Sequence, residues 1–284
     1  MSGFSSEWLA LREPADTAAR NPAVVARLAG LLSGRSVSRF VDLGCGTGSN
    51  VRYLASRVPG AQEWTLVDSD EGHLAEARSR TAALRDIEPE DVRTLAIDLA
   101  SGLDALPLEE GVVVTASALL DLVSADWLRR LLARCRESHS IVLFALSYDG
   151  RIELSPREPD DEWVRDLVNR HQRTDKGFGT ALGPDATDFA RSCLEGLKYR
   201  VEVAESDWVL EAGETRIQEE LLKGWAAAAG DMAAAEMGAS AADQCSLWLR
   251  TRLDHLSRGV SRVRVGHQDL IGWPSRDAID PTRL

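Results

Sequence analysis

The stretch that decides the fold of this chain is Phe40-Val41-Asp42-Leu43-Gly44-Cys45-Gly46-Thr47-Gly48-Ser49. Its apolar first part is typical of a buried strand, and three glycines at every second position follow directly. Glycine has no Cβ, so this turn can bend sharply and lets a ligand approach the backbone before the next helix begins. The stretch therefore predicts a strand, a ligand-binding turn and a helix, in that order.

Short apolar runs alternate with helical patterns from this stretch as far as residue 147. Such alternation is typical of parallel strands joined by crossover helices. Strands are predicted at residues 39–43, 64–68, 92–97, 111–116 and 141–147. Helices are predicted at residues 50–57, 72–84 and 125–136. We therefore expect an α/β fold with a doubly wound, mostly parallel sheet.

The chain after residue 147 has a different rhythm. Residues 148–184 combine an extended polar start, a helical pattern at 160–171 and a segment rich in glycine and charge, so we expect an inserted lid there. Residues 199–204 and 206–210 predict a terminal β-hairpin that closes the sheet. Helical patterns at 215–229 and 241–257 then predict a helical hairpin, followed by a last extended segment.

These patterns divide the chain into three parts. The expected division is an N-terminal helical cap (1–37), a Rossmann-like domain with the insertion 148–184 (38–211), and a C-terminal helical addition with the final extended segment (212–284).

Composition limits the partners and the location of the protein. The 33 Lys and Arg against 45 Asp and Glu give a net charge of −12, which disfavours nucleic acid and anionic membranes. The most apolar long stretch, 224–248, contains Asp231, Glu236 and Asp243, which argues against a membrane span. The first residues lack the pattern of a signal or transit peptide, so we expect a cytoplasmic protein. The four cysteines lie far apart and predict no metal site.

The glycine spacing separates two kinds of cofactor. The position that would complete the dinucleotide fingerprint G-x-G-x-x-G is Ser49, which weakens a nicotinamide or flavin interpretation. Asp42, two residues before Gly44, is the stronger clue. Asp42-x-Gly44-x-Gly46-x-Gly48 resembles the first motif of the class I S-adenosylmethionine-dependent methyltransferases. The resemblance implies a seven-stranded sheet and a turn that cradles the amino-acid end of S-adenosylmethionine.

Further cofactor contacts are implied at the ends of the following strands. Asp68, with Ser69 beside it, is placed to accept both ribose hydroxyl protons, as the family's acid does. Asp98 resembles the family's ligand of the adenine edge, with Leu99 packing on the ring, although an Asp after a strand is also a common turn former. Ser117 is expected at the methionine part of the cofactor.

Two further groups each have two interpretations. An N-terminal amphipathic helix could fold over the cofactor and offer Arg20 to its carboxylate, or could be a plain surface helix. Asp121 is a candidate catalytic residue that orients the acceptor or removes its proton, or else a helix cap.

Basic residues gather between His171 and Gly179 in an otherwise acidic chain. His171 is a candidate catalytic group, and Arg173 and Lys176 are candidate ligands of an anionic substrate. The competing interpretation is a solvated loop. The chain also lacks the Asn/Asp-Pro-Pro-aromatic motif of the enzymes in this superfamily that methylate amino groups of DNA or glutamine amides of proteins, which favours a small-molecule substrate.

The sequence is thus interpreted as a methyltransferase that uses S-adenosylmethionine and a small, anionic acceptor. A nicotinamide-dependent oxidoreductase is an alternative that would need the longer glycine spacing. A non-catalytic protein that binds an S-adenosyl ligand is another, in which the acceptor pocket would be filled. A homodimer is a candidate, and the sequence does not decide the oligomeric state.

Overall fold

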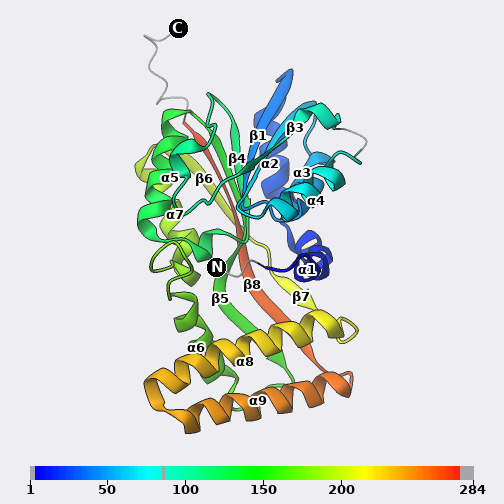
Figure 1. Cartoon of the computed structure of the whole chain (residues 1–284), viewed down its shortest axis with the longest axis vertical. Coiled ribbons are helices and arrows are strands. Elements are labelled where there is room, and N and C mark those ends of the chain that lie inside the picture. The colour runs from blue at the N-terminus through cyan, green and yellow to red at the C-terminus, as the bar shows by residue number, and fades with distance from the viewer. Residues whose placement is uncertain (1–3, 85–86, 276–284) are drawn as a thin grey trace.

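The computed structural model describes residues 4–84 and 87–275, and its centre is one eight-stranded sheet (Figure 1). The strand order is β3-β2-β1-β4-β5-β8-β6, and β7 pairs with β8 beside this path. The first five strands pair in parallel, whereas β8 is antiparallel to β5, β6 and β7. The strands are β1 (Val37–Leu43), β2 (Ala61–Asp68), β3 (Val92–Ala96), β4 (Val113–Ser117), β5 (Ile141–Ser155), β6 (Tyr199–Glu205), β7 (Trp208–Leu210) and β8 (Arg262–Pro274). The predicted doubly wound α/β fold is confirmed, but the sheet has eight strands where the resemblance implied seven, because β6 and β7 both pair with β8.

Helices cover both faces of this sheet (Figure 1). Helices α2, α3 and α4 lie on one side, and α5 and α7 lie on the other. The described α-helices are α1 (Ser6–Ala19), α2 (Pro22–Leu32), α3 (Ser49–Ala55), α4 (Glu71–Thr81), α5 (Ala125–Glu137), α6 (Asp161–Gln172), α7 (Ala186–Gly196), α8 (Thr215–Met237) and α9 (Ala239–Ser257). Short 3₁₀ turns are η1 (Pro89–Asp91), η2 (Leu103–Ala105), η3 (Leu120–Leu122) and η4 (Gly183–Asp185). None of the helices in the described ranges combines the length and apolarity needed to cross a membrane.

The sheet separates two apolar cores because successive side chains of a strand point to opposite faces. In β1, Phe40 packs into one core, where it stacks on Trp64 of β2 with ring centroids 4.1 Å apart. The next residue, Val41, packs into the other core, beneath α5 and α7. Because the sheet is buried on both faces, the carboxyl ends of its strands are held in fixed positions, where a site can form.

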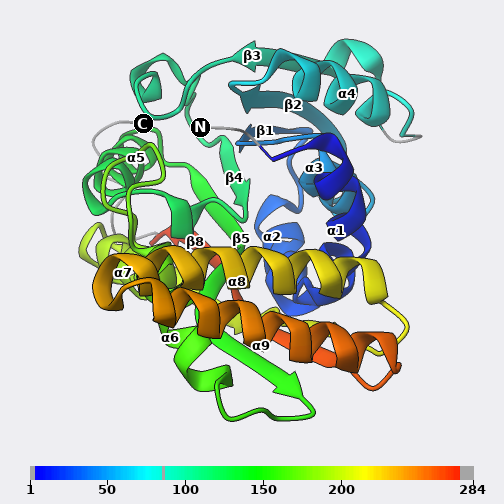
Figure 2. The same ribbon diagram turned by 60° about the horizontal axis from the view of Figure 1, so that its bottom comes forward.

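The longest strands, β5 and β8, continue beyond the rest of the sheet and carry a second region (Figures 1 and 2). We call this region the distal lobe: the outer halves of β5 (148–155) and β8 (262–267), with α6, α8 and α9. Helices α8 and α9 form the predicted helical hairpin and lie across these strand ends. The extended start of the expected insertion is therefore, as far as Ser155, part of the central sheet.

The predicted hairpin of residues 199–204 and 206–210 is wrong. Strands β6 and β7 do not pair with each other but follow one another along the same edge of β8, opposite Gln268–Pro274 and Val263–Val265. The break between them is occupied by Asp207, whose carboxylate accepts hydrogen bonds from Arg151, Arg264 and the backbone of His267. Because β8 is 13 residues long, it has room for both segments in one line.

Candidate active site

The glycine turn has the backbone conformation that the sequence predicts. Gly44, Gly46 and Gly48 have φ values of 61°, 51° and 82°, in the left-handed region that favours glycine. A Cβ on Gly48 would lie 3.2 Å from the Ala77 Cβ and 3.3 Å from its Cα, so this glycine allows α3 to pack closely on α4. The turn therefore presents its backbone to the space above the sheet.

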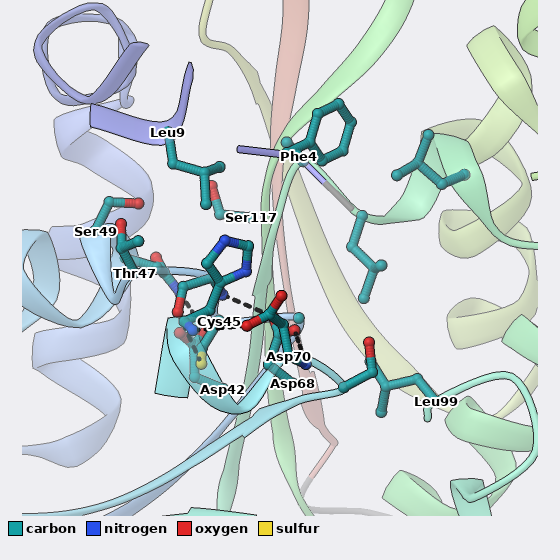
Figure 3. Close-up of a pocket in the computed structure, with 18 of the residues that line it drawn as sticks. Phe4, Leu9, Asp42, Cys45, Thr47, Ser49, Asp68, Asp70, Leu99 and Ser117 are labelled. Atoms are coloured by element: carbon teal, nitrogen blue, oxygen red, sulfur yellow. Dashed lines mark hydrogen bonds between the residues drawn. The ribbon is translucent and has the colours of Figure 1, made fainter. Parts of the chain in front are cut away.

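A cavity of about 490 Å³ lies at this edge of the sheet (Figure 3). It is bounded by the glycine turn, the ends of β2 and β4, the segment after β3, helix α1 and one loop from the second half of the chain. The lining residues that the sequence predicted are Asp42, Gly44, Gly46, Asp68, Ser69, Asp98, Leu99, Ser117 and Lys176. Figure 3 shows Asp42, Cys45, Asp68 and Asp70 on one side of this space, with Phe4 and Leu9 on the other.

Asp68 connects the glycine turn to the end of β2. Its Oδ2 accepts a hydrogen bond from the Gly46 N–H at 2.9 Å, and its Oδ1 accepts one from the Asp70 N–H at 3.0 Å. A carboxylate has about four lone-pair sites, so acceptor capacity remains for hydroxyl groups in the cavity. The geometry fits the role that the resemblance implies for this acid.

Asp42 is buried beneath the turn and belongs to a chain of side chains. It accepts hydrogen bonds from Asn50 Nδ2 at 2.6 Å and from Thr115 Oγ1 at 2.7 Å. Burial raises the pKa of Asp42 to about 6, although these hydrogen bonds oppose the shift. Among the described residues, its buried Oδ2 has no hydrogen-bond partner, and Asp42 also lines the cavity.

Arg20 extends this chain from behind and is absent from the cavity lining. Its Nη1 donates to Asn50 Oδ1 at 2.7 Å, and its Nε lies 3.4 Å from Asp269 Oδ2. The guanidinium also lies over the Tyr53 ring, 4.5 Å from the centroid. The structure thus places Arg20 where it orients Asn50 and Asp42, and not in contact with the large cavity.

Asp98 forms a turn and also lines the cavity, while its contact with the adenine stays a prediction. Its carboxylate accepts hydrogen bonds from the Ala100 N–H at 3.0 Å and from Ser101 Oγ at 3.2 Å, so it forms the turn after β3 and also lines the cavity. Leu99 is buried, and its carbonyl accepts a hydrogen bond from Trp127 Nε1 at 2.6 Å. This bond fixes the apolar wall that Leu99 contributes.

The opposite wall comes largely from α1, and the sequence did not identify its residues. Phe4, Leu9, Arg12 and Asp16 all line the cavity. Arg12 is held by Asp16 through bonds of 2.9 and 3.1 Å. The amphipathic character of this segment was the available signal, but it does not say which residue faces a ligand.

Glu13 connects α1 to α3 and α4. Its carboxylate accepts two hydrogen bonds of 2.7 Å from Arg52 and one of 2.8 Å from Arg80. Arg52 also donates to the Thr47 carbonyl of the glycine turn at 2.6 Å. One guanidinium therefore holds both the turn and the helix that covers it.

The basic segment divides into residues at the cavity and residues outside it. Lys176 lines the cavity, together with Phe178, whereas His171 and Arg173 do not. Arg173 is exposed and pairs with Asp185 at 2.9 Å. His171 lies behind Lys176, with its Nδ1 3.2 Å from the Lys176 Nζ.

Residues 174–180, which we call the lysine turn, are compact. Asp175 forms a β-bridge with Thr180, and its Oδ1 accepts hydrogen bonds from the Gly177 and Gly179 N–H groups at 2.6 and 3.1 Å. Phe178 packs edge-on against Trp127 of α5, at 5.4 Å. The two glycines, which have φ values of 96° and 86°, are therefore accounted for by the shape of this turn.

Asp121 is buried beneath the lysine turn and is absent from the cavity lining. Burial raises its pKa to about 6, while the charges of Arg12 and Lys176 act in the opposite direction. Within the part of the chain that the structure describes, its Oδ1 has no hydrogen-bond partner. Asp121 thus lies near Arg12 and Lys176 but does not line the cavity.

Comparisons with known proteins agree with this architecture. Residues 40–139 match the family described as a methyltransferase domain. A cyclopropane-fatty-acyl-phospholipid synthase-like protein from Lactobacillus casei superposes with a TM-score of 0.53 at 13% identity, over 95% of both chains. The YcgJ protein from Bacillus subtilis gives 0.51 at 14% identity, over 90% of this chain and 100% of that one. The search of curated proteins found no match.

The family match identifies residues 40–139 as a methyltransferase domain, and the fold agrees with that match. The chain carries an S-adenosylmethionine-dependent methyltransferase domain. The glycine turn lies within the matched residues 40–139, and the cavity is bounded by these residues together with α1 and the lysine turn. Within residues 4–84 and 87–275, no three His, Cys, Asp or Glu side chains form a group that could hold a metal ion.

Proposed function

We propose that the methyl acceptor of this enzyme is a small anionic metabolite that binds between α1 and the lysine turn. The observation that carries the proposal is the Lys176 ammonium on the cavity wall. Its neighbours Arg12 and Arg173 are paired with Asp16 and Asp185, but within the described ranges no carboxylate lies within ion-pair distance of Lys176. An anionic group of the substrate would supply that missing charge partner.

The surroundings of Lys176 support this role. Burial lowers the pKa of Lys176, and the charge of Asp121 opposes this shift. A half-buried cation attracts an anion more strongly than a solvated one, because the local dielectric is lower. The apolar side chains of Phe4, Leu122 and Phe178 line the same space, which favours an acceptor with an apolar body.

The size of the cavity supports a small acceptor. About 490 Å³ falls within the usual range of small-molecule sites, and the cofactor occupies part of it. A nucleic acid substrate would also be repelled by a chain with a net charge of −12.

The same proposal also assigns the residues that bind the cofactor. Asp68, with Ser69 beside it, holds the ribose, Asp98 and Leu99 hold the adenine, and Gly44, Gly46 and Ser117 surround the methionine part. Gly48 shapes the turn, and Arg20 orients Asn50 and Asp42 from behind. When bound, S-adenosylmethionine supplies an electrophilic methyl group on a sulfonium.

The residues of this chain then contribute mainly alignment. Lys176 fixes the anionic end of the acceptor, while Leu9 of α1 and Phe4, which precedes α1, cover the cavity and exclude water. Cys45 also lines the cavity, but burial raises the pKa of its thiol, so it stays protonated. Asp121 stays a candidate proton acceptor for a hydroxyl or amine, and its contact with a substrate requires a rearrangement of the covering side chains.

Titration with S-adenosylhomocysteine, followed by turnover of a metabolite extract with a trideuterated methyl donor, tests the proposal. Separating the extract by anion exchange before the reaction should place the labelled product in the retained, anionic fraction. Lys176→Gln should lose that product while still binding S-adenosylhomocysteine, and Arg173→Gln is the matched control. Labelled product only in the unretained fraction would refute an anionic acceptor.

Two alternatives from the sequence lose support. The open acceptor side of the cavity, between Ser117 and Lys176, argues against a non-catalytic binding protein. The methyltransferase match argues against a nicotinamide-dependent oxidoreductase. The cytoplasmic location and a homodimer stay predictions.

A further inference from the structure

We infer that His171 is a positioning residue for substrate binding: in its neutral form it holds the Lys176 ammonium in place on the cavity wall. The inference rests on the proposed function, because it assigns a role to the group that fixes Lys176. His171 itself touches neither the cavity nor a reacting atom.

The hydrogen bonds around Lys176 define this role. The Lys176 Nζ lies 3.2 Å from His171 Nδ1 and 3.1 Å from Thr174 Oγ1. Thr174 Oγ1 donates its own proton to the His171 carbonyl at 2.8 Å, so it can accept the ammonium proton. Two of the three ammonium protons are thereby used, and the third is left for a ligand in the cavity.

The same geometry fixes the protonation of His171. An ammonium group only donates, so Nδ1 must accept and the ring proton must sit on Nε2. Burial and the charge of Lys176 both lower the pKa of His171, while the carboxylate of Asp231 on α8 opposes them. The neutral ring is therefore the form that fits beside a charged Lys176.

The backbone makes this arrangement rigid. His171 lies in the last turn of α6, and the Thr174 N–H donates to its carbonyl at 3.0 Å. The lysine turn is then fixed by Asp175 and by Phe178 on α5. The flexible side chain of Lys176 is thus confined at its backbone and at its ammonium group. This confinement lowers the conformational entropy that is lost when an anion binds.

The chain is well suited to a direct test, because it contains only three lysines, Lys176, Lys198 and Lys223. Lysine labelled with ¹³C at Cε gives three NMR signals in the full chain loaded with S-adenosylhomocysteine, and Lys176→Arg assigns the relevant one. In a titration between about pH 5 and 8, the Lys176 signal should show a step as His171 gains its proton. Lys198 and Lys223 are internal controls that should not show it.

Two substitutions of His171 separate positioning from packing. In His171→Asn the amide oxygen can take the place of Nδ1 but does not titrate, so the step due to His171 should disappear while the Lys176 signal stays near its position at neutral pH. A step that remains near pH 6 reports Asp121, whose charge also acts on Lys176. His171→Ala should shift that signal at every pH. Unchanged Lys198 and Lys223 signals show that each variant is folded. A Lys176 signal whose position and pH dependence are unchanged in both variants would overturn the inference.

Binding of 4-fluorobenzoate, followed by ¹⁹F line broadening, connects the positioning to substrate affinity. At neutral pH, His171→Ala should weaken binding about tenfold, the worth of one charge-assisted hydrogen bond, while His171→Asn stays within about twofold of the parent protein. Equal losses in both variants would contradict positioning. If Lys176→Gln leaves the affinity unchanged, the anionic acceptor is refuted, and the lysine titration still decides the role of His171.

Discussion

The two halves of the cavity are built in different ways. The cofactor half comes from strand ends that follow one another between Asp42 and Leu99, and backbone N–H groups orient its main carboxylate, Asp68. The acceptor half joins α1 to the lysine turn, which lies more than 150 residues further along the chain. Side-chain ion pairs and hydrogen bonds, such as those of Glu13 and Lys176, hold this half together.

The difference separates what the fold requires from what one enzyme can vary. Carboxyl ends of parallel strands meet at one edge in every doubly wound sheet, so the cofactor half follows from the topology. The acceptor half depends on contacts between distant segments, which can change without loss of the sheet. We therefore expect substitutions in the two halves to have separable effects.

The largest effect is expected in the distal lobe, which supports the acceptor half through α6. Asp161, at the start of α6, accepts hydrogen bonds from Arg252 Nε at 3.0 Å, from Arg252 Nη2 and from Trp248 Nε1 at 2.9 Å. Asp161→Ala leaves the fully buried Arg252 without its charge partner, which should lower the free energy of unfolding by about 3–5 kcal/mol.

Urea unfolding measures this loss, and Asp254→Ala is the control, since the Asp254 side chain forms an exposed ion pair with Arg258 at 3.3 Å. Below the unfolding transition, the affinity of Asp161→Ala for S-adenosylhomocysteine should match that of the parent protein. A large loss of cofactor affinity in the folded variant would show that the two halves are coupled through the sheet.

The second effect belongs to the cofactor half. Asp68→Ala removes the carboxylate that orients Gly46 and that we assign to the ribose. Two charge-assisted hydrogen bonds of about 1.5 kcal/mol each correspond to a loss of about 100-fold in affinity for S-adenosylhomocysteine. Isothermal titration calorimetry measures this loss, with Asp104→Ala, an exposed acid paired with Arg130, as the control. An unchanged dissociation constant would exclude Asp68 from the site.

A smaller effect is expected at Glu13, where the two halves meet. Glu13→Gln keeps the shape of the side chain but removes the charge shared by Arg52 and Arg80, so the free energy of unfolding should fall by about 1 kcal/mol. Because Arg52 also holds the glycine turn, cofactor affinity should fall with it. Glu76→Gln is the control, since among the described residues Glu76 forms a single ion pair, with Arg80 at 3.3 Å.

The same pair predicts a pH dependence. Burial acts to raise the pKa of Glu13, but the hydrogen bonds and charges of Arg52 and Arg80 outweigh it and lower the pKa. A carboxylate with a lowered pKa contributes stability above its unfolded pKa and loses it as the pH falls through the folded one. The stability difference between the parent protein and Glu13→Gln should therefore shrink in acid. A constant difference down to about pH 3 would contradict this assignment.

The sequence predicted those parts of the fold and site that depend on residues close together in the chain. Asp42, Asp68 and Asp98 were predicted to line one site because each ends a strand with a clear apolar pattern. The pairing of β6 and β7 with one long β8 was not predicted, because strand length in the tertiary structure decides it. Arg12 was missed for a related reason: an amphipathic pattern identifies the apolar face of α1, but not which polar residue at its border meets a cavity.

The smallest effect is expected at Arg173, which the sequence could not distinguish from Lys176. Both are cations within three residues of each other, yet Arg173 pairs with Asp185 in solvent whereas Lys176 lines the cavity. An exposed ion pair contributes about 0–1 kcal/mol, and added salt screens it. Arg173→Gln should therefore change the free energy of unfolding by less than about 1 kcal/mol and leave 4-fluorobenzoate binding unchanged, while Lys176→Gln weakens it. Equal losses of anion affinity in the two variants would mean that the whole basic segment attracts the acceptor at long range, and would remove the special role of Lys176 in the acceptor half.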